Sequence, residues 1–205
     1  VTTVVTGNCS LGLAPAHAYD HDMLSSVLSH VEAIPLEAIR EGVTWSWETV
    51  PEYLDVLDRK LGVNVASLIG HSAVRRYVMG EASQEREATG TEIEEMKAIV
   101  REGIEAGALG VSFERNYRHF DWDGRLAPTN LATDAEILAV ASVVDEVGVG
   151  VIQVGGDQAL GKQIAEVSGR PVFYGNITQQ AVAPDRWRSR LAEAEEMLPD
   201  RKSVV

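Results

Sequence analysis

The sequence predicts an α/β fold built on a parallel sheet. Short apolar runs rich in β-branched residues alternate with segments whose apolar residues recur at helical spacing, and polar side chains follow the runs. Apolar runs of this kind are typical of parallel strands that are buried on both faces. About five strands are visible, whereas a (β/α)8 barrel needs eight strands and typically about 250 residues. The residues alone therefore favour either a complete open sheet or the middle of a barrel.

The strands are predicted from composition and from the turns that follow them. The first run ends at the turn residues Gly7 and Asn8, and the second follows Leu61 and Gly62. The expected strands are residues 1–6, 63–69, 109–113, 149–154 and 171–174.

The helices between the strands are predicted from caps and periodicity. Thr89 and Glu92 fit a capping box, in which the Thr hydroxyl bonds the third amide and the Glu reaches back. Thr133 and Glu136 repeat this pattern. Residues 122–128 are expected to form an exposed loop. The expected helices are residues 51–60, 89–107, 133–148, 160–167 and 185–198.

Composition and charge exclude several classes of protein. The 205 residues carry 18 basic and 31 acidic side chains, a net charge of −13, so we expect no nucleic-acid partner. No stretch approaches the roughly 20 apolar residues of a membrane span, so we expect no membrane partner. The single cysteine excludes an internal disulfide, and the first residues do not look like a signal peptide. We therefore expect a cytoplasmic location.

Both ends of the chain look unnatural. It opens without Met inside an apolar run, and residues 200–205 match what a common sequencing-adapter DNA encodes in one reading frame. We therefore expect a gene fragment in which residues 1–199 are native and residues 200–205 are a non-native tail.

Candidate functional residues follow the strands, because reacting groups in such folds sit at the carboxyl ends of strands. In chain order these residues are Asn8, Cys9 and Ser10; His71, Ser72 and Arg75; Glu114, Arg115, Asn116 and His119; Gln153 and Asp157; and Asn176, Thr178 and Gln179.

Each main candidate has a functional and a structural interpretation. A thiolate at Cys9 could bind zinc or act as a nucleophile, but Cys9 could equally be a small buried hydrophobe. His71 could be a ligand, a general base or an orienting group, or it could bond a carbonyl and hold its loop. Arg115 beside Glu114 could clamp a substrate carboxylate or form a salt bridge at the rim.

The N-terminal histidines His17, His21 and His30 suggest a ligand cluster on paper, since His17 and His21 would share one face of a helix. A metalloprotease carries its acidic catalytic residue directly after the first histidine, and that position is Ala18 here. A loop or a solvated surface is the favoured interpretation.

Several motifs together resemble the N-acyl-D-amino-acid deacylase branch of the amidohydrolase superfamily. The resemblance covers roughly residues 1–199 and is dense up to about residue 145. The motifs are Val1-Thr-Thr-Val-Val-Thr-Gly-Asn-Cys9-Ser, Trp45-Ser-Trp-Glu48, Gly70-His71 with Val74-Arg75, Glu105-Ala-Gly-Ala-Leu-Gly110, and Asp123-Gly-Arg125.

This resemblance implies an α/β fold that is part of a (β/α)8 TIM barrel, about strands two to six, of the metal-dependent hydrolase type. It implies hydrolysis of a small-molecule amide, an N-acyl-D-amino acid or similar compound, with Zn²⁺ as cofactor and Cys9 as a zinc ligand. Zinc would polarise the carbonyl and activate water. The general-base Asp and the first-strand histidine pair would lie outside this chain.

The sequence departs from the family at the fifth and sixth barrel strands, where typical members place histidines. Gln153 and Asn176 stand there instead, and Asn is a poor zinc ligand. We therefore expect an altered site, with His71, Glu114, Arg115, Gln153 and Asn176 as second-shell or substrate-side residues. The alternative is a metal-free binding or vestigial barrel module without hydrolase activity.

Overall fold

The chain folds around one parallel sheet in the computed structural model, which describes residues 1–59, 61–155, 157–175, 177, 182–197 and 203–204. No helix in this described part is long and apolar enough to cross a membrane. The strands are β1 (Thr3–Thr6), β2 (Asn64–Gly70), β3 (Gly110–Glu114), β4 (Val151–Gly155), β5 (Val172–Tyr174) and β6 (Ser203–Val204).

The order of the strands distinguishes the two architectures that the sequence left open. The six strands are all parallel and lie in the order β1-β2-β3-β4-β5-β6, so each strand pairs with its neighbours along the chain. An open doubly wound sheet reverses its strand order at a switch point, and no reversal occurs among the described strands. Strictly sequential order is what a segment of a (β/α)8 barrel requires.

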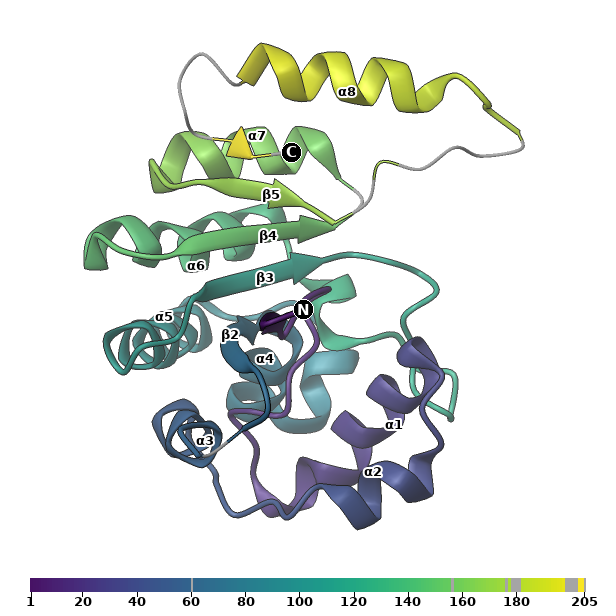
Figure 1. Cartoon of the computed structure of the whole chain (residues 1–205), viewed down its shortest axis with the longest axis vertical. Coiled ribbons are helices and arrows are strands. Elements are labelled where there is room, and N and C mark those ends of the chain that lie inside the picture. Colours follow the sequence, from purple (N-terminus) through teal and green to yellow (C-terminus); the bar gives the residue numbers. More distant parts are fainter. Residues whose placement is uncertain (60, 156, 176, 178–181, 198–202, 205) are drawn as a thin grey trace.

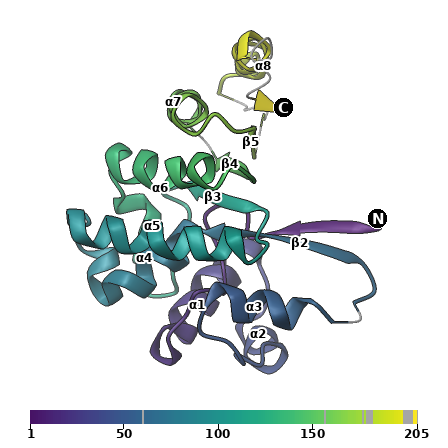
Figure 2. The same ribbon diagram turned by 90° about the vertical axis from the view of Figure 1, so that its left-hand side faces the viewer.

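The helices form a second layer. The helices are α1 (His21–Glu32), α2 (Leu36–Gly42), α3 (Val50–Leu57), α4 (His71–Met79), α5 (Gly90–Glu105), α6 (Asp134–Val147), α7 (Gln158–Ser168) and α8 (Arg186–Met197). Helices α5, α6 and α7 stack along one side of strands β3 to β5, which Figure 2 shows edge-on. Helices α1 and α2 pack against each other at the lower right of Figure 1, away from this stack.

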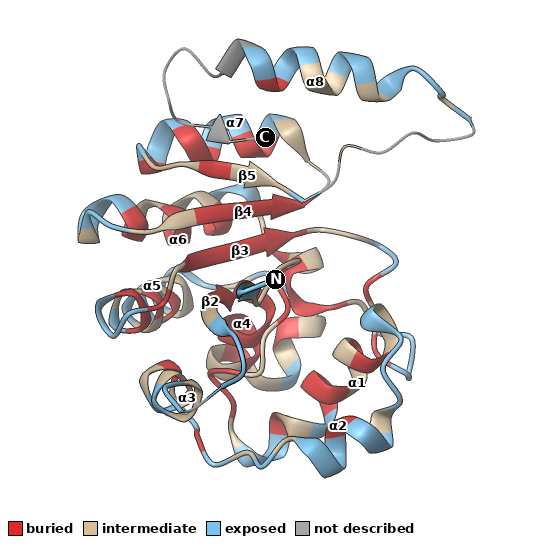
Figure 3. Cartoon of the chain, viewed as in Figure 1, coloured by how far each residue is buried: buried red, intermediate tan, exposed pale blue. Residues whose placement is uncertain are grey.

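The core lies between the sheet and this helical layer. Val111 and Phe113 of β3 and Ile152 and Val154 of β4 are buried against the helices, and Figure 3 shows both strands buried over most of their length. Ser112 and Gln153 alternate with these residues, so they point to the opposite face of the sheet. That opposite face carries the polar side chains discussed below.

The strands and most helices confirm the sequence predictions to within about three residues. Thr89 and Glu92 form the predicted capping box of α5. The box predicted for α6 forms only in part: Thr133 Oγ1 accepts from the Glu136 amide at 3.1 Å, but the Glu136 carboxylate bonds elsewhere. The sequence prediction missed α1, α2 and α4.

The expected loop at residues 122–128 needs one correction. Trp122 is 60% exposed, as a loop residue should be, but Ala127 and Pro128 are buried. Pro128 begins a short 3-10 helix, Pro128–Leu131, which packs against α4. The short strand β6 lies within the segment predicted to be non-native, and the site described below does not involve it.

Candidate metal centre at the strand ends

Cys9 lies in a tight turn directly after β1. Both Cys9 and Ser10 adopt left-handed backbone angles, with φ of 59° and 61°. This conformation costs a residue other than glycine about 1–2 kcal/mol, so it persists only where the surroundings hold it in place. The amide of Leu11 donates to the carbonyl of Asn8 at 3.0 Å and closes the turn.

Side chains of β3 and β4 hold the backbone of this turn. The Cys9 amide donates to Gln153 Oε1 at 2.8 Å, and the Ser10 amide donates to Ser112 Oγ at 3.1 Å. Ser112 Oγ in turn donates to the carbonyl of Gly7 at 2.5 Å. The structure therefore brings Cys9 and Gln153, both predicted as site residues, into direct contact.

Glu114 stands at the end of β3 in a space that only a glycine can leave open. Its carboxylate is buried, and Oε1 accepts from Asn116 Nδ2 at 3.0 Å. Oε2 has no hydrogen-bond partner in the described part of the chain. The facing residue on β4 is Gly155, where a Cβ would lie 2.1 Å from Oε2. The sheet thus accommodates a buried carboxylate with one unused oxygen.

The Cys9 thiol and the Glu114 carboxylate influence each other. Burial, the neighbouring Glu114 carboxylate and the negative charge of Glu32 together raise the pKa of the Cys9 thiol to about 12, and burial has the largest effect. The thiol is therefore protonated at neutral pH when no cation is present. A bound cation reverses this preference, because a coordinating thiol is deprotonated.

His119 lies near Glu114. Its Nε2 is 3.2 Å from Asn116 Nδ2 and 3.9 Å from Glu114 Oε1, and its Nδ1 is buried without a hydrogen-bond partner among the described residues. Burial lowers the pKa of His119, and the negative charge of Glu114 opposes this effect. A neutral imidazole beside a carboxylate is a chemically suitable donor for a transition metal.

These residues fit part of a zinc site. A thiol and a carboxylate with an unused buried oxygen are donors that zinc prefers. However, no group of three His, Cys, Asp or Glu side chains is close enough to hold a metal ion within the described residues. The described chain therefore offers Cys9 and Glu114 as two donors of one incomplete site.

The remaining predicted site residues lie in other places. Arg115 Nη2 contacts Asp134 Oδ1 at 2.5 Å and Asp157 Oδ2 at 3.6 Å, which links it to the beginnings of α6 and α7. His71 is fully buried at the start of α4, where its Nδ1 lies 3.0 Å from Thr129 Oγ1. Asn176 lies outside the described residues, as do Thr178 and Gln179.

The three N-terminal histidines do not come together. His17 stacks on Tyr77, His21 on Trp45 and His30 on Phe120, with ring centroids 3.9, 4.0 and 4.0 Å apart. His21 and His30 belong to α1 rather than to an irregular segment. The same helix supplies Glu32, whose influence on Cys9 the sequence reasoning missed because the helix itself was missed.

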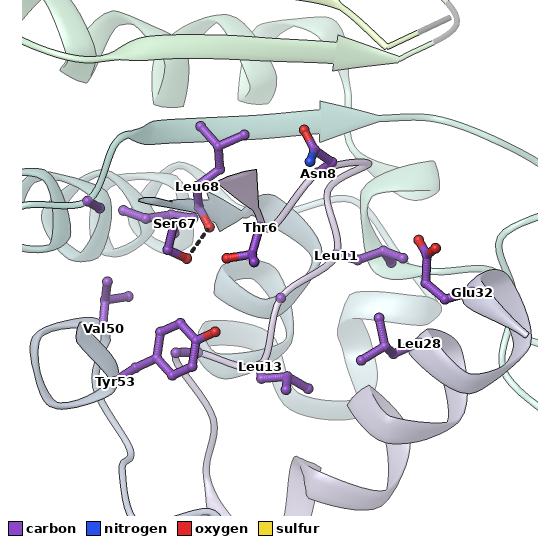
Figure 4. Close-up of a pocket in the computed structure, with 15 residues that line it drawn as sticks. Thr6, Asn8, Leu11, Leu13, Leu28, Glu32, Val50, Tyr53, Ser67 and Leu68 are labelled. Atoms are coloured by element: carbon purple, nitrogen blue, oxygen red, sulfur yellow. Dashed lines mark hydrogen bonds between the residues drawn. The ribbon is translucent and has the colours of Figure 1, made fainter. Parts of the chain in front are cut away.

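A cavity of about 350 Å³ lies beside the turn, between the end of β1 and helices α1 and α3. Figure 4 shows Asn8 and Glu32 at one end and Tyr53 at the other, with Leu11 and Leu28 between α1 and the turn. Its volume falls within the range of small-molecule sites, which are mostly apolar with a few polar groups.

Comparison with known proteins gives matches to one family. A model described as "Amidohydrolase family" matches residues 1–203. A D-aminoacylase of Alcaligenes xylosoxydans xylosoxydans is 35% identical over 142 residues, which cover 68% of this chain and 25% of that protein. A protein of Mycobacterium tuberculosis (strain H37Rv) without an assigned function is 37% identical over 156 residues, 70% of this chain and 25% of the relative. The chain spans about a quarter of the length of these relatives.

Solved structures show the same fold. A D-aminoacylase structure described by its binuclear metal centre superposes with a TM-score of 0.71 at 27% identity, covering 96% of this chain and 39% of that one. An N-acyl-D-glutamate deacylase from Bordetella bronchiseptica, complexed with zinc and a phosphonate inhibitor, superposes with a TM-score of 0.68 at 23% identity, covering 98% and 39%.

Proposed function

The chain belongs to the amidohydrolase family, and from this premise we propose that the protein hydrolyses the amide bond of a small N-acylated D-amino acid or a similar compound. The observation that carries the proposal is the buried Glu114 carboxylate at the end of β3, whose Oε2 has no hydrogen-bond partner among the described residues and which lies close enough to the Cys9 thiol to raise its pKa. The D-aminoacylase relatives support the substrate class. We further propose that residues 1–199 form the central part of one barrel domain and that residues 200–205 are not native.

Cys9 and Glu114 would hold the metal in this proposal. Their sulfur and oxygen donors suit zinc, and the zinc-bound deacylase supports that choice of ion. When bound, zinc would polarise the scissile carbonyl and activate water for attack. Glu114 was expected from the sequence only as a second-shell or substrate-side residue, and its unused Oε2 now makes it a candidate ligand.

Gln153 has two proposed tasks. Its Oε1 fixes the Cys9 amide, and its Nε2 is a buried donor without a partner among the described residues. We infer that Nε2 donates to an oxygen of the substrate, since a buried unpaired amide donor is costly unless a ligand satisfies it. The mostly apolar cavity beside the turn would take the acyl group.

The first experiment measures metal content and hydrolysis together. The complete reading frame is expressed, and bound metal per chain is determined by elemental analysis for the wild type, Cys9→Ala and Cys9→Ser. Hydrolysis of N-acetyl-D- and N-acetyl-L-amino acids is measured on the same samples. We expect zinc in the wild type, loss of zinc in Cys9→Ala, and a preference for the D-substrates.

Two results would contradict the proposal. A metal-loaded wild type that hydrolyses none of these amides would reject deacylation. A wild type that retains no metal after growth with added zinc would instead favour the metal-free binding module. The cytoplasmic location stays a prediction.

A further inference from the structure

The turn that carries Cys9 is held from behind by a buried chain of hydroxyl groups. Ser10 Oγ lies 3.1 Å from Ser72 Oγ, and Ser72 Oγ lies 2.9 Å from Thr129 Oγ1. Thr129 Oγ1 lies 3.0 Å from His71 Nδ1. All four residues are at most 3% exposed. No sequence motif predicted this chain of contacts, because its residues come from the turn, α4 and the 3-10 helix Pro128–Leu131.

The far end of this chain is anchored by an ion pair. Glu136 Oε1 accepts from Arg75 Nε at 2.8 Å, and His71 Nε2 lies 3.4 Å from the same oxygen. Arg75 donates further to the carbonyls of Pro128 at 3.0 Å and Arg86 at 2.7 Å. The Arg75 guanidinium thus fixes the carboxylate on one side and the backbone next to Thr129 on the other.

The direction of the hydrogen bonds follows from the two ends. His71 Nε2 faces the Glu136 carboxylate at 3.4 Å without forming a hydrogen bond to it. A neutral His71 with its proton on Nε2, toward this negative charge, accepts at Nδ1 from the Thr129 hydroxyl. Thr129 Oγ1 then accepts from Ser72. Ser72 Oγ accepts from Ser10, whose hydroxyl also donates to the Glu114 carbonyl at 3.4 Å. The Ser72 and Thr129 hydroxyls therefore each donate once and accept at least once within the described structure.

The backbone strain lies at the free end of this chain. Cys9 and Ser10 are the two consecutive left-handed residues, and Ser10 is fixed by Ser72 through two contacts. Besides the hydroxyl pair, the Ser72 amide donates to the Ser10 carbonyl at 3.0 Å. Gly70 allows this approach, since a Cβ there would lie 2.4 Å from the Leu11 carbonyl oxygen.

We propose that Thr129 and Ser72 are positioning residues, which hold the Cys9–Ser10 turn in the conformation that presents the thiol to a metal ion. This inference rests on the proposed function, because it assigns a purpose to the Cys9 thiol as a ligand. Both positioning residues lie on the α4 side of the strand ends, and neither touches metal or substrate.

The test uses the full-length protein loaded with Co²⁺ or Zn²⁺. A cobalt–thiolate bond gives a near-ultraviolet charge-transfer band, which reports the geometry at Cys9 directly, and zinc affinity is measured by competition with a chelator. The variants are Thr129→Val, which removes the hydroxyl at nearly constant shape, and Thr129→Ser, which keeps it. Ser72→Ala tests the next link, and Ser168→Ala removes a buried hydroxyl on α7, away from the chain.

We expect Thr129→Val and Ser72→Ala to lose about 10–100-fold in zinc affinity and to alter the cobalt band, whereas Thr129→Ser and Ser168→Ala stay close to the wild type. Thermal unfolding identifies any variant that fails to fold, in which case the Thr129→Ser comparison decides. Wild-type affinity and spectrum in Thr129→Val would overturn the positioning role alone. A wild type without a thiolate band that depends on Cys9 would overturn the metal assignment and this inference with it.

Discussion

Two buried polar clusters lie on either side of the Cys9 turn, and they differ in how their charges are balanced. Behind the turn, Glu136 pairs with Arg75, and the carbonyls of Pro128 and Arg86 accept from the same guanidinium. In front of it, Glu114 has no arginine or lysine partner among the described residues and only His119 at 3.9 Å. The first cluster balances its buried charges internally, although Glu136 Oε2 and His71 Nε2 have no hydrogen-bond partner among the described residues. The second has a negative charge and donor atoms that a cation would satisfy.

The largest expected effect comes from breaking the balanced cluster. Glu136→Gln keeps the shape of the side chain but leaves the Arg75 charge buried without its partner. Removing one partner of a buried pair costs about 3–5 kcal/mol, so we expect a loss of that size in the free energy of unfolding. Denaturant titration measures it, and a loss below about 1 kcal/mol would show that the pair is not the support described here.

The next effect concerns pH and again involves the balanced cluster. Burial, together with the positive charge of Arg75, lowers the pKa of His71 to about 3 from its ordinary 6.5. Between pH 3 and 6.5 the unfolded state binds more protons at His71 than the folded state does. The contribution of neutral His71 to the free energy of unfolding is therefore complete above pH 6.5 and is lost as the pH falls toward 3, by about 1.4 kcal/mol per pH unit. Unfolding measured from pH 6.5 to 5 should show this slope, and His71→Gln should remove it.

The smallest effect on stability is expected in the unbalanced cluster. Glu114→Gln is the matched change to Glu136→Gln, yet it removes a buried charge that has no strong partner. We expect the stability of the metal-free protein to change by less than about 1 kcal/mol. The pKa of the Cys9 thiol should fall from about 12 toward its ordinary 9.0, because the hydrogen bond and charge of Glu114 both raise it.

Alkylation of Cys9 as a function of pH, followed by peptide mass spectrometry, measures this change. An equal loss of stability in Glu114→Gln and Glu136→Gln would remove the contrast between the two clusters.

The sequence predicted the regular part of the fold well because its signals are local. The strands β3 and β4 were expected at residues 109–113 and 149–154 and lie at Gly110–Glu114 and Val151–Gly155. Helix α4 was missed because it starts directly after β2 without a side-chain cap and carries two buried arginines, Arg75 and Arg76. Both features contradict the usual pattern of a capped helix with an exposed charged face.

The candidate site was predictable only as a set of residues at strand ends. Cys9, Glu114 and Gln153 were all named from that rule, but their mutual contacts depend on the left-handed turn and on the space left by Gly155. Glu136 shows how a local sequence signal can mislead. Its position three residues after Thr133 indicates a capping box, and the buried Arg75, far away in sequence, takes its carboxylate instead.

The hydrogen bond between the Cys9 amide and Gln153 joins residues that are 144 positions apart. During synthesis at about 5–20 residues per second, Cys9 therefore emerges on the order of 10 s before its partner exists. Over that interval its thiol is neither buried nor beside Glu114, so it has the ordinary reactivity of a free cysteine toward oxidants and stray metal ions. Folding of β3 and β4 onto the turn ends this exposure, so the Cys9 thiol is most open to oxidation before β4 has been made.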